Sequence, residues 1–235
     1  MPGLLARAGT GGVRIPAPTY NEHAAAFRSA GFDIVPVLGG AATAATVLVH
    51  PNNPDGRLWT AADLPANGLL VVDESFCDIC AEQSLVPVIA DRPKTLVLKS
   101  FGKFWGLAGL RLGFVIGAPA EIARLREMTG PWSVSGPALA IGATALEDLD
   151  WADNTRARLK EDAARLDALM ANTGAVCVGG TSLFRLYRTG NATALQERLA
   201  HGYVWSRRFP YSDEWLRLGL PGQDPDWQQL ERALV

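Results

Sequence analysis

The sequence predicts an α/β protein whose main part is a mostly parallel sheet, followed by a smaller α+β unit toward the C-terminus. Three short runs carry the first half of this prediction: "ATVLVH" (45–50), "GLLVVD" (68–73) and "TLVLKS" (95–100). Each is apolar over most of its length and is followed by turn residues, which is typical of strands buried on both faces of a parallel or mixed sheet. A fourth run, "LGFVIG" (112–117), predicts a further strand.

Helical segments lie between and after these strands. The stretches 20–31 and 118–130 end in Gly31 and Gly130, and glycine suits the C-terminus of a helix. Residues 136–172 are rich in Ala, Leu and charged side chains and predict one or two long helices. We therefore expect a large domain in residues 1–135 and connecting helices in residues 136–173.

The remaining residues, 174–235, predict a small α+β domain. Strand patterns occur in 175–187, 203–209 and 214–220, and helical patterns occur in 191–202 and 224–235. Elements of both kinds in so short a segment can bury their apolar faces against one another around a core of their own.

The composition argues against several classes of partner. Lys and Arg number 22 against 24 Asp and Glu, and the basic residues form no long run, so nucleic acid and acidic membrane surfaces are poor candidates. The apolar runs are shorter than the roughly 18 to 20 residues that a membrane span needs. The N-terminus "MPGLLARAGTGG" lacks the regions of a signal peptide, and we therefore expect a cytoplasmic protein.

The three cysteines are too few for a disulfide framework. Cys77 and Cys80 form a C-x-x-C pattern, but a zinc site of this kind needs a second pair, and a thioredoxin-like site needs the pattern at the start of a helix. We interpret these two residues as thiols buried in the protein, and no metal is expected.

Polar residues follow three of the expected strands, where ligands of open α/β sheets bind. They are Asn52 and Asn53, Asp73 and Glu74, and Ser100 with Lys103. Each has a structural explanation when taken alone: "PNNPDG" is a turn sequence, an aspartate caps helices, and a loop lysine is often only solvated. Lys103 does not belong to a phosphate loop of the G-x-x-x-x-G-K-[ST] type, and G-x-G-x-x-G follows none of the expected strands.

Taken together, these segments are more specific. In order and approximate spacing, "PNNPDG" (51–56), "VVDESF" (71–76) and "SFGKFWGLAGLRLGF" (100–114) resemble the motifs of the fold type I pyridoxal-phosphate enzymes, the aspartate aminotransferase superfamily. The resemblance extends from about Pro18 to the C-terminus. It implies a large α/β domain, a small C-terminal α+β domain, and pyridoxal 5'-phosphate as the cofactor.

The resemblance also implies a role for individual residues. Lys103 matches the lysine that forms a Schiff base with the cofactor aldehyde, and Asp73 matches the aspartate that pairs with the pyridine nitrogen. Asn53 matches the asparagine that binds the phenolic oxygen of the ring and lines the substrate site. Ser100 and Arg111 match positions that bind the cofactor phosphate, where arginine offers a planar fork of donors.

Two further residues are implied less directly, because their motifs are short. Tyr20, in "PTY", matches the aromatic ring that stacks on the pyridine and acts in catalysis; its alternative is a half-buried core tyrosine. Arg217, in "WLRLGLPG", matches the arginine that binds the substrate carboxylate; its alternative is a surface strand residue with a long apolar stem.

Within the superfamily, the resemblance is greatest to the threonine-phosphate decarboxylases, with histidinol-phosphate aminotransferases as near relatives. The latter usually have Tyr where this chain has Phe76. The implied reaction is the decarboxylation of L-threonine O-3-phosphate, a small phosphorylated amino acid, to aminopropanol phosphate in cobalamin biosynthesis. Transamination is the alternative, because it differs only in which bond of the substrate is oriented for cleavage. Arg207 and Arg208 are candidates for binding the substrate phosphate.

Relatives in this superfamily are longer at the N-terminus, where a glycine-containing loop at a helix N-terminus binds the cofactor phosphate. The resemblance therefore implies that this chain lacks the N-terminal part of the large domain. It also implies a homodimer if that part is present. A third interpretation follows, in which the chain is an inactive fragment that retains the fold.

Overall fold

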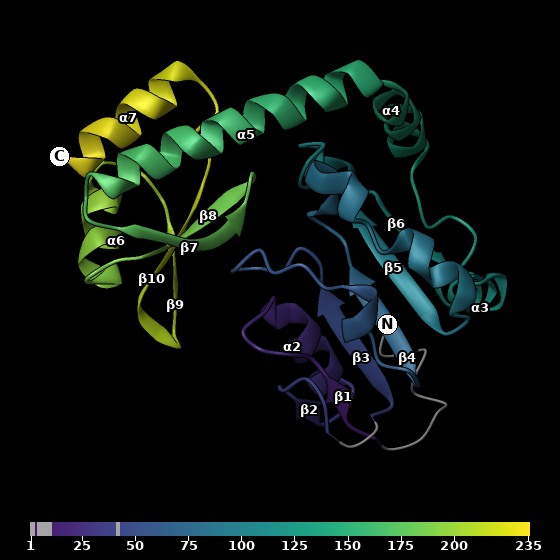
Figure 1. Cartoon of the computed structure of the whole chain (residues 1–235). Helices are drawn as coiled ribbons and strands as arrows, with labels where there is room; N and C mark the ends of the chain where they lie inside the picture. Colours follow the sequence, from purple (N-terminus) through teal and green to yellow (C-terminus); the bar gives the residue numbers. More distant parts are fainter. Residues whose placement is uncertain (1–2, 4–10, 41–42) are drawn as a thin grey trace. The chain divides into compact units, whose positions relative to one another are not determined.

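The computed structural model describes residue 3, residues 11–40 and residues 43–235, with only the backbone described at positions 90 and 91. Most of the N-terminal stretch that was compared with a signal peptide lies outside the described residues. The chain divides into two compact units: unit 1 holds residues up to 53 and residues 57–148, and unit 2 holds residues 54–56 and 149–235 (Figure 1). This division separates groups of residues that contact one another and does not define folding domains. The predicted domain limits 1–135, 136–173 and 174–235 therefore stay a prediction.

Unit 1 contains a six-stranded sheet in the order β2-β1-β3-β4-β5-β6. Neighbouring strands from β2 to β5 run parallel, and β6 is antiparallel to β5, which confirms the predicted mostly parallel α/β sheet (Figure 1). The strands are β1 Val13–Arg14, β2 Ile34–Val35, β3 Ala45–Val49, β4 Leu69–Asp73, β5 Thr95–Ser100 and β6 Gly113–Gly117. The two shortest strands, β1 and β2, were not expected from the sequence.

Side chains of β3, β4 and β5 alternate between two buried faces of this sheet, as strand geometry requires. One face carries Val47, Val71 and Leu96 and is covered by α2 (Asn21–Ser29) and α3 (Pro119–Thr129). The opposite face carries Leu48, Leu70, Val72 and Val97 and is covered around the short helices η1 (Ala61–Asp63) and η3 (Val86–Asp91). Polar side chains of β4 therefore have room only at the end of the strand.

Local sequence signals explain how the helices of unit 1 begin and end. Helix α4 (Gly136–Glu147) starts at Ser135, whose hydroxyl oxygen accepts the Ala138 N–H at 3.4 Å. Helix α3 ends at Gly130, which has a φ of 75°, a conformation that glycine adopts without strain. Helix α2 ends one residue earlier than expected, at the C-cap Ala30, and Gly31 follows in the left-handed region. Two more short helices, η2 (Cys77–Gln83) and η4 (Ala108–Leu110), complete the unit.

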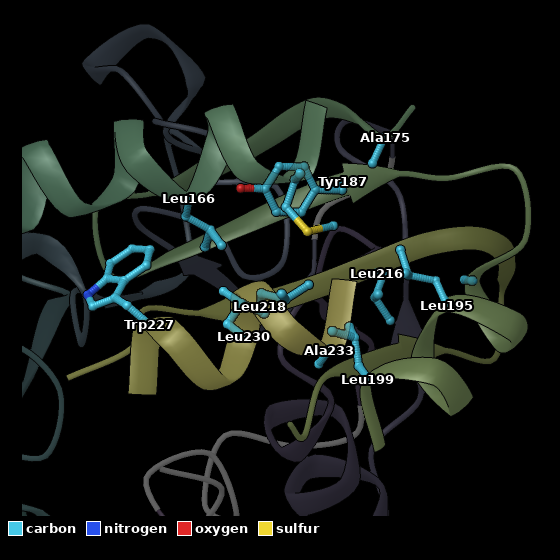
Figure 2. Packing of buried hydrophobic residues seen from close by; sticks show 12 residues of the cluster. Leu166, Ala175, Tyr187, Leu195, Leu199, Leu216, Leu218, Trp227, Leu230 and Ala233 are labelled. Carbon is cyan, nitrogen blue, oxygen red and sulfur yellow. The ribbon is translucent and has the colours of Figure 1, made fainter. Parts of the chain in front are cut away.

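Unit 2 is the small α+β unit that the sequence predicted. Its sheet is antiparallel in the order β7-β8-β10-β9, and its three helices pack with the sheet. Figure 2 shows the resulting core, where Leu166, Tyr187, Leu216 and Trp227 come from four different elements. The elements are α5 Leu149–Ala171, β7 Val176–Thr181, β8 Phe184–Arg188, α6 Ala192–His201, β9 Arg207–Phe209, β10 Ser212–Gly219 and α7 Asp224–Leu234.

The turn Pro54–Gly56 belongs to unit 2, although the residues on either side of it belong to unit 1. The Gly180 N–H donates to the Asp55 carbonyl oxygen at 2.8 Å. A Cβ atom on Gly56 would lie 1.9 Å from the Gly180 carbonyl oxygen, and Gly56 has a φ of 72°. Gly56 of "PNNPDG" is thus required for two reasons: its backbone conformation in the turn, and the close approach of the Gly180 backbone, to which Asp55 is hydrogen-bonded. Among the described residues, no helix is both long and apolar enough to cross a membrane.

The core of unit 2 predicts the effect of a truncation. Leu216 is 0% exposed and packs among residues of four elements, so Leu216→Ala should lower the free energy of unfolding by about 2 to 5 kcal/mol. The matched control is Leu149→Ala, because Leu149 is 68% exposed and its loss should cost less than about 0.5 kcal/mol. Urea unfolding followed by circular dichroism measures both. Equal effects would show that Leu216 does not support a packed core.

Candidate active site

Asp73 is the last residue of β4, at the carboxyl end of the buried strands. Its backbone is fixed on one side, because the His50 N–H donates to the Asp73 carbonyl oxygen at 2.8 Å. The side chain is only 6% exposed. Its Oδ1 accepts the backbone N–H of Ser75 at 3.0 Å and also the Ser75 hydroxyl, and its Oδ2 lies 2.7 Å from Nε2 of His23.

These contacts decide the charge of Asp73. Burial alone would raise the pKa of the carboxyl group, but the hydrogen bond and charge of His23, together with the two hydrogen bonds from Ser75, hold this pKa below its ordinary value. The group is therefore an ionised carboxylate, and His23 donates to it. A carboxylate has about four lone-pair positions, and donors among the described residues use three of them. The second position on Oδ2 can accept one further donor.

His23 is the site residue that the sequence analysis missed. It lies on α2, three residues after Tyr20, and residues with this spacing are neighbours on a helix. The two rings meet edge to face, with centroids 5.5 Å apart and planes at 85°. Tyr20, which is the N-cap residue of α2 and is 42% exposed, is thus placed next to the partner of Asp73. The spacing from Tyr20 was the available signal, but its meaning required the position of Asp73.

The two asparagines after β3 do different things. Asn52 is buried, and its Oδ1 accepts the Thr19 hydroxyl at 2.6 Å while its Nδ2 donates to the Pro18 carbonyl oxygen at 3.0 Å. Asn52 therefore ties the end of β3 to the segment that leads into Tyr20. Asn53, the residue predicted to bind the cofactor ring, follows it and is half-buried.

Lys103 lies on an exposed loop after β5. The loop is closed by two backbone hydrogen bonds, from the Gly106 N–H to the Lys103 carbonyl oxygen at 3.1 Å and from the Leu107 N–H to the Phe101 carbonyl oxygen at 3.0 Å. The Lys103 Nζ is 5.7 Å from the centroid of the Phe76 ring. Since Phe76 is three residues beyond Asp73, the structure brings Lys103 to the segment that follows β4.

Ser100 and Arg111 come from the two chain segments that meet at the end of β5. The Phe101 N–H donates to the Leu112 carbonyl oxygen at 3.2 Å, which joins the residues next to both of them. Arg111 is exposed, has a φ of 55°, and uses one N–H to bind the Ala108 carbonyl oxygen at 3.1 Å. The Ser100 oxygen accepts the Gly102 N–H at 3.2 Å, so its own hydroxyl proton is still a donor. This pair offers donors of the kind that bind an anion.

Arg217 lies in unit 2, on β10, and its cross-strand partner on β9 is Arg207. Cross-strand partners project from the same face of a sheet, so two guanidinium groups share this face. Burial and the charge of Arg207 lower the pKa of Arg217, whose guanidinium carbon is 5.1 Å from the centroid of the Phe184 ring. Arg208 pairs with the core residue Leu216 instead and donates to the Thr193 hydroxyl of α6.

A cluster of potential metal ligands lies under the end of β4, but its hydrogen bonds speak against a metal. The ligand atoms of His50, Glu74 and Cys77 lie within 4.8 Å of one another. His50 Nδ1 accepts the Trp59 N–H at 3.0 Å, and its Nε2 donates to the Gln83 carbonyl oxygen at 2.8 Å. Both ring nitrogens are therefore used. The Cys77 thiol is buried, and its hydrogen bond to Cys80 together with burial raises its pKa, so it stays a neutral thiol.

Unit 1 thus has the fold of a mixed α/β sheet protein, with an ionised carboxylate, an exposed lysine, a serine hydroxyl and an exposed arginine near the ends of neighbouring strands. Residues 3–234 match the family model for aminotransferase class I and II, and the chain belongs to this family. The chain is 40% identical to a threonine-phosphate decarboxylase of Sinorhizobium sp over 235 residues, which cover 95% of this chain and 70% of that protein. It is 38% identical over 240 residues to a protein of the same name from Pseudomonas aeruginosa, with coverages of 96% and 72%.

A solved structure shares the fold. The histidinol-phosphate aminotransferase of Sinorhizobium meliloti, determined with pyridoxal-5'-phosphate, superposes with a TM-score of 0.81 at 19% identity and covers 99% of this chain and 72% of its own. The likeness confirms the predicted fold type I architecture.

The residues at the strand ends fit pyridoxal phosphate, the cofactor of this family. The remaining lone-pair position on Asp73 Oδ2 suits the protonated ring nitrogen, because the carboxylate is ionised. Ser100 and Arg111 supply a hydroxyl and a guanidinium for a phosphate, and Lys103 supplies an amine.

The bond from His23 predicts a pH-dependent loss of stability. Because the pKa of Asp73 is lowered in the folded chain, the ionised carboxylate stabilises the fold above its unfolded pKa of about 4, and this stability is lost as the pH falls below that value. His23→Ala should raise the pKa of Asp73, so the variant should be less stable than the native chain at pH 7, and the difference should shrink toward pH 3.5. The measurement is urea unfolding across this range.

The matched control is His201→Ala, which removes an exposed histidine at the end of α6 and should leave the pH dependence unchanged. A constant difference between the native chain and His23→Ala at all pH values would show that His23 does not act through the charge of Asp73.

Proposed function

We propose that this chain is a pyridoxal-phosphate-dependent decarboxylase that converts L-threonine O-3-phosphate to aminopropanol phosphate, a step of cobalamin biosynthesis. The observation that carries the proposal is the identity of 40% and 38% to two proteins that are both named threonine-phosphate decarboxylase, across 95% and 96% of the chain. The ionised Asp73 and the exposed Lys103 at neighbouring strand ends support it.

In this proposal Lys103 holds the cofactor covalently through its amine, and Asp73 keeps the proton on the ring nitrogen. Asn53 binds the phenolic oxygen, and Ser100 and Arg111 bind the cofactor phosphate. Tyr20 stacks on the ring. The support for Asp73 is its charge, since a carboxylate that stays ionised when buried makes loss of that proton unfavourable.

Pyridoxal phosphate, when bound, supplies an electron sink for the electron pair that is left on the substrate Cα when CO2 departs. Asp73 keeps that sink effective, because a protonated ring nitrogen withdraws electrons more strongly than a neutral one. In its ammonium form, Lys103 would give the proton that Cα needs to become the product, and it would be left as a neutral amine.

The substrate carries two anionic groups, and unit 2 carries two guanidinium groups on one sheet face. We assign Arg217 to the carboxylate and Arg207 to the phosphate. The two arginines lie directly opposite each other on β9 and β10, so their guanidinium groups are close enough to bind the two anionic groups of one small molecule. Arg208 is a weaker candidate, since it lies on the other face and is bound to Thr193.

The orientation of the carboxylate decides between decarboxylation and transamination, because the bond that breaks must lie perpendicular to the cofactor ring. Arg217 would set this orientation, and misplacement by about an ångström is enough to change a rate by orders of magnitude. By resemblance to the family, we also propose that the enzyme acts in the cytoplasm as a homodimer.

The role of Lys103 predicts a covalent adduct. The native chain incubated with pyridoxal phosphate should absorb as a lysine adduct, and borohydride reduction followed by peptide mapping should locate it on Lys103; Lys103→Ala should abolish it. Lys160→Ala, which removes an exposed lysine of α5, is the control and should keep the adduct. With threonine phosphate, the native chain should release CO2 and aminopropanol phosphate.

Other outcomes separate the alternatives. An adduct together with a keto product instead of CO2 would favour an aminotransferase. Absence of any adduct on the native chain would identify an inactive fragment that retains the fold. An adduct that persists in Lys103→Ala would refute the assignment of Lys103.

The two neighbouring arginines predict a contrast in substrate binding. Arg207→Gln should raise the KM for threonine phosphate by about 10- to 100-fold, because a hydrogen bond to a charged group is worth roughly 1.5 to 3 kcal/mol. Arg208→Gln, the matched control, should change the KM less than about twofold. The measurement is steady-state kinetics of CO2 release. A larger effect of Arg208→Gln would move the phosphate to the other face of the sheet.

A further inference from the structure

A network of hydrogen-bonded side chains ends on the loop that carries Lys103. The buried carboxylate of Glu74 lies 2.9 Å from Nζ of Lys99, and the same Nζ lies 2.9 Å from Oδ1 of Asp78. The other carboxylate oxygen of Asp78 accepts the indole N–H of Trp105 at 3.0 Å. Trp105 is two residues beyond Lys103, so this network connects the end of β4 and the strand β5 to the loop.

The charges of Glu74, Lys99 and Asp78 hold these three side chains in place. Burial would lower the pKa of Lys99, but Asp78 and Glu74 together raise it, so the ammonium group stays charged between two carboxylates. Glu74 is 0% exposed and also accepts the Leu85 N–H at 2.6 Å. Removing one member would leave another buried charge without its partner, which is costly. Asp78 is therefore a fixed acceptor for Trp105.

The ring of Trp105 packs against neighbouring aromatic rings, in addition to the hydrogen bond made by its N–H. It stacks on Phe101, with centroids 5.3 Å apart and planes at 13°, and it meets Phe104 edge-on at 5.1 Å. These two phenylalanines lie on either side of Lys103 in the sequence. Trp105 thus contacts both flanks of the lysine.

The loop needs such an anchor because glycines flank the lysine. Gly102 precedes Lys103, and Gly106 follows Trp105 with a φ of 69°. Glycine restricts the backbone least of all residues, so the two backbone hydrogen bonds that close the loop are its main local constraints. The bond from Trp105 to Asp78 supplies a constraint from a different part of unit 1.

We propose that Trp105 is a positioning residue for Lys103, and that the hydrogen bond from its indole N–H to Asp78 fixes the loop that presents the lysine amine. This proposal rests on the proposed function, in which Lys103 attaches the cofactor. If the ring of Trp105 only packed, phenylalanine would replace it without loss. The N–H is the feature that phenylalanine lacks, and it is therefore the feature to remove.

The test uses the full chain and the variants Trp105→Phe and Asp78→Asn. Trp132→Phe is the matched control, because Trp132 is 94% exposed. The first readout is the rate at which pyridoxal phosphate attaches to Lys103, trapped with borohydride and mapped by peptide analysis. The second is made without cofactor: the pH dependence of Lys103 acetylation by acetic anhydride, relative to that of Lys160. Urea unfolding shows whether each variant is folded.

Trp105→Phe should slow attachment at least tenfold and shift the acetylation profile of Lys103, while the chain stays folded and Trp132→Phe behaves as the native chain. Asp78→Asn should act in the same direction, because Lys99 and Trp105 bind different oxygens of Asp78 and the amide NH2 that replaces one of these oxygens cannot accept a hydrogen bond. The double variant should be no slower than the slower single variant, since both substitutions remove the same bond.

Two results would overturn the proposal. Attachment at the native rate in Trp105→Phe would show that the N–H does not position Lys103, while the role of Lys103 itself would stand. Additive effects in the double variant would show that the two residues act separately. This outcome decides against the proposal even if Trp105→Phe is partly unfolded, because the double variant is then compared with Asp78→Asn. Absence of an adduct on native Lys103 is a different failure, because it removes the proposed function and with it this inference.

Discussion

The buried, ionised carboxylate of Asp73 is the constraint on which the rest of unit 1 depends. Charge at a position so little exposed is stable only with several donors, and these come from two places: Ser75 in the turn after β4, and His23 on α2. The bond to His23 fixes α2 against the end of the sheet. The position of α2 in turn fixes Tyr20 at its start, so one charge organises the two segments that carry most of the site.

The same logic holds on the far side of β4. Glu74, the next residue, is also buried and charged, and it is satisfied by Lys99 of β5 and by the backbone of Leu85. Asp73 and Glu74 therefore have separate partners. Donors among the described residues leave one lone-pair position on Asp73 unused, whereas Glu74 belongs to the hydrogen-bonded network that reaches Trp105 on the Lys103 loop. Adjacent side chains of a strand project to opposite faces, which explains how two neighbouring carboxylates can serve separate networks.

In unit 2, charges of the same sign lie next to each other, whereas the buried carboxylates of unit 1 are paired with donors. There the like charges of Arg207 and Arg217 are placed side by side, and burial increases the cost of that arrangement, as the lowered pKa of Arg217 shows. In the proposed function, a substrate anion bound there would interact with both guanidinium groups. Both units lie within the match to the aminotransferase class I and II family, which covers residues 3–234.

The sequence by itself determined the strands β3 to β6, the helices α2 to α7 and the small α+β unit, because burial on both faces, helical spacing and turn residues leave local patterns. The order of short motifs also predicts Lys103 and Asp73 as site residues. The sequence could not identify β1 and β2, which are two residues long, or the partners His23 and Asp73, which are 50 residues apart.

Only the tertiary structure decided which of two adjacent arginines lies beside Arg217. The register of β9 against β10 puts Arg207 and not Arg208 beside Arg217, and a shift of one residue would exchange them. In the same way, the contact of Trp105 with Asp78 depends on how a loop after β5 folds back on a helix 27 residues earlier in the chain. Local sequence patterns record whether a side chain is buried, but its distant partner is set by strand register and loop closure, which act over the whole fold.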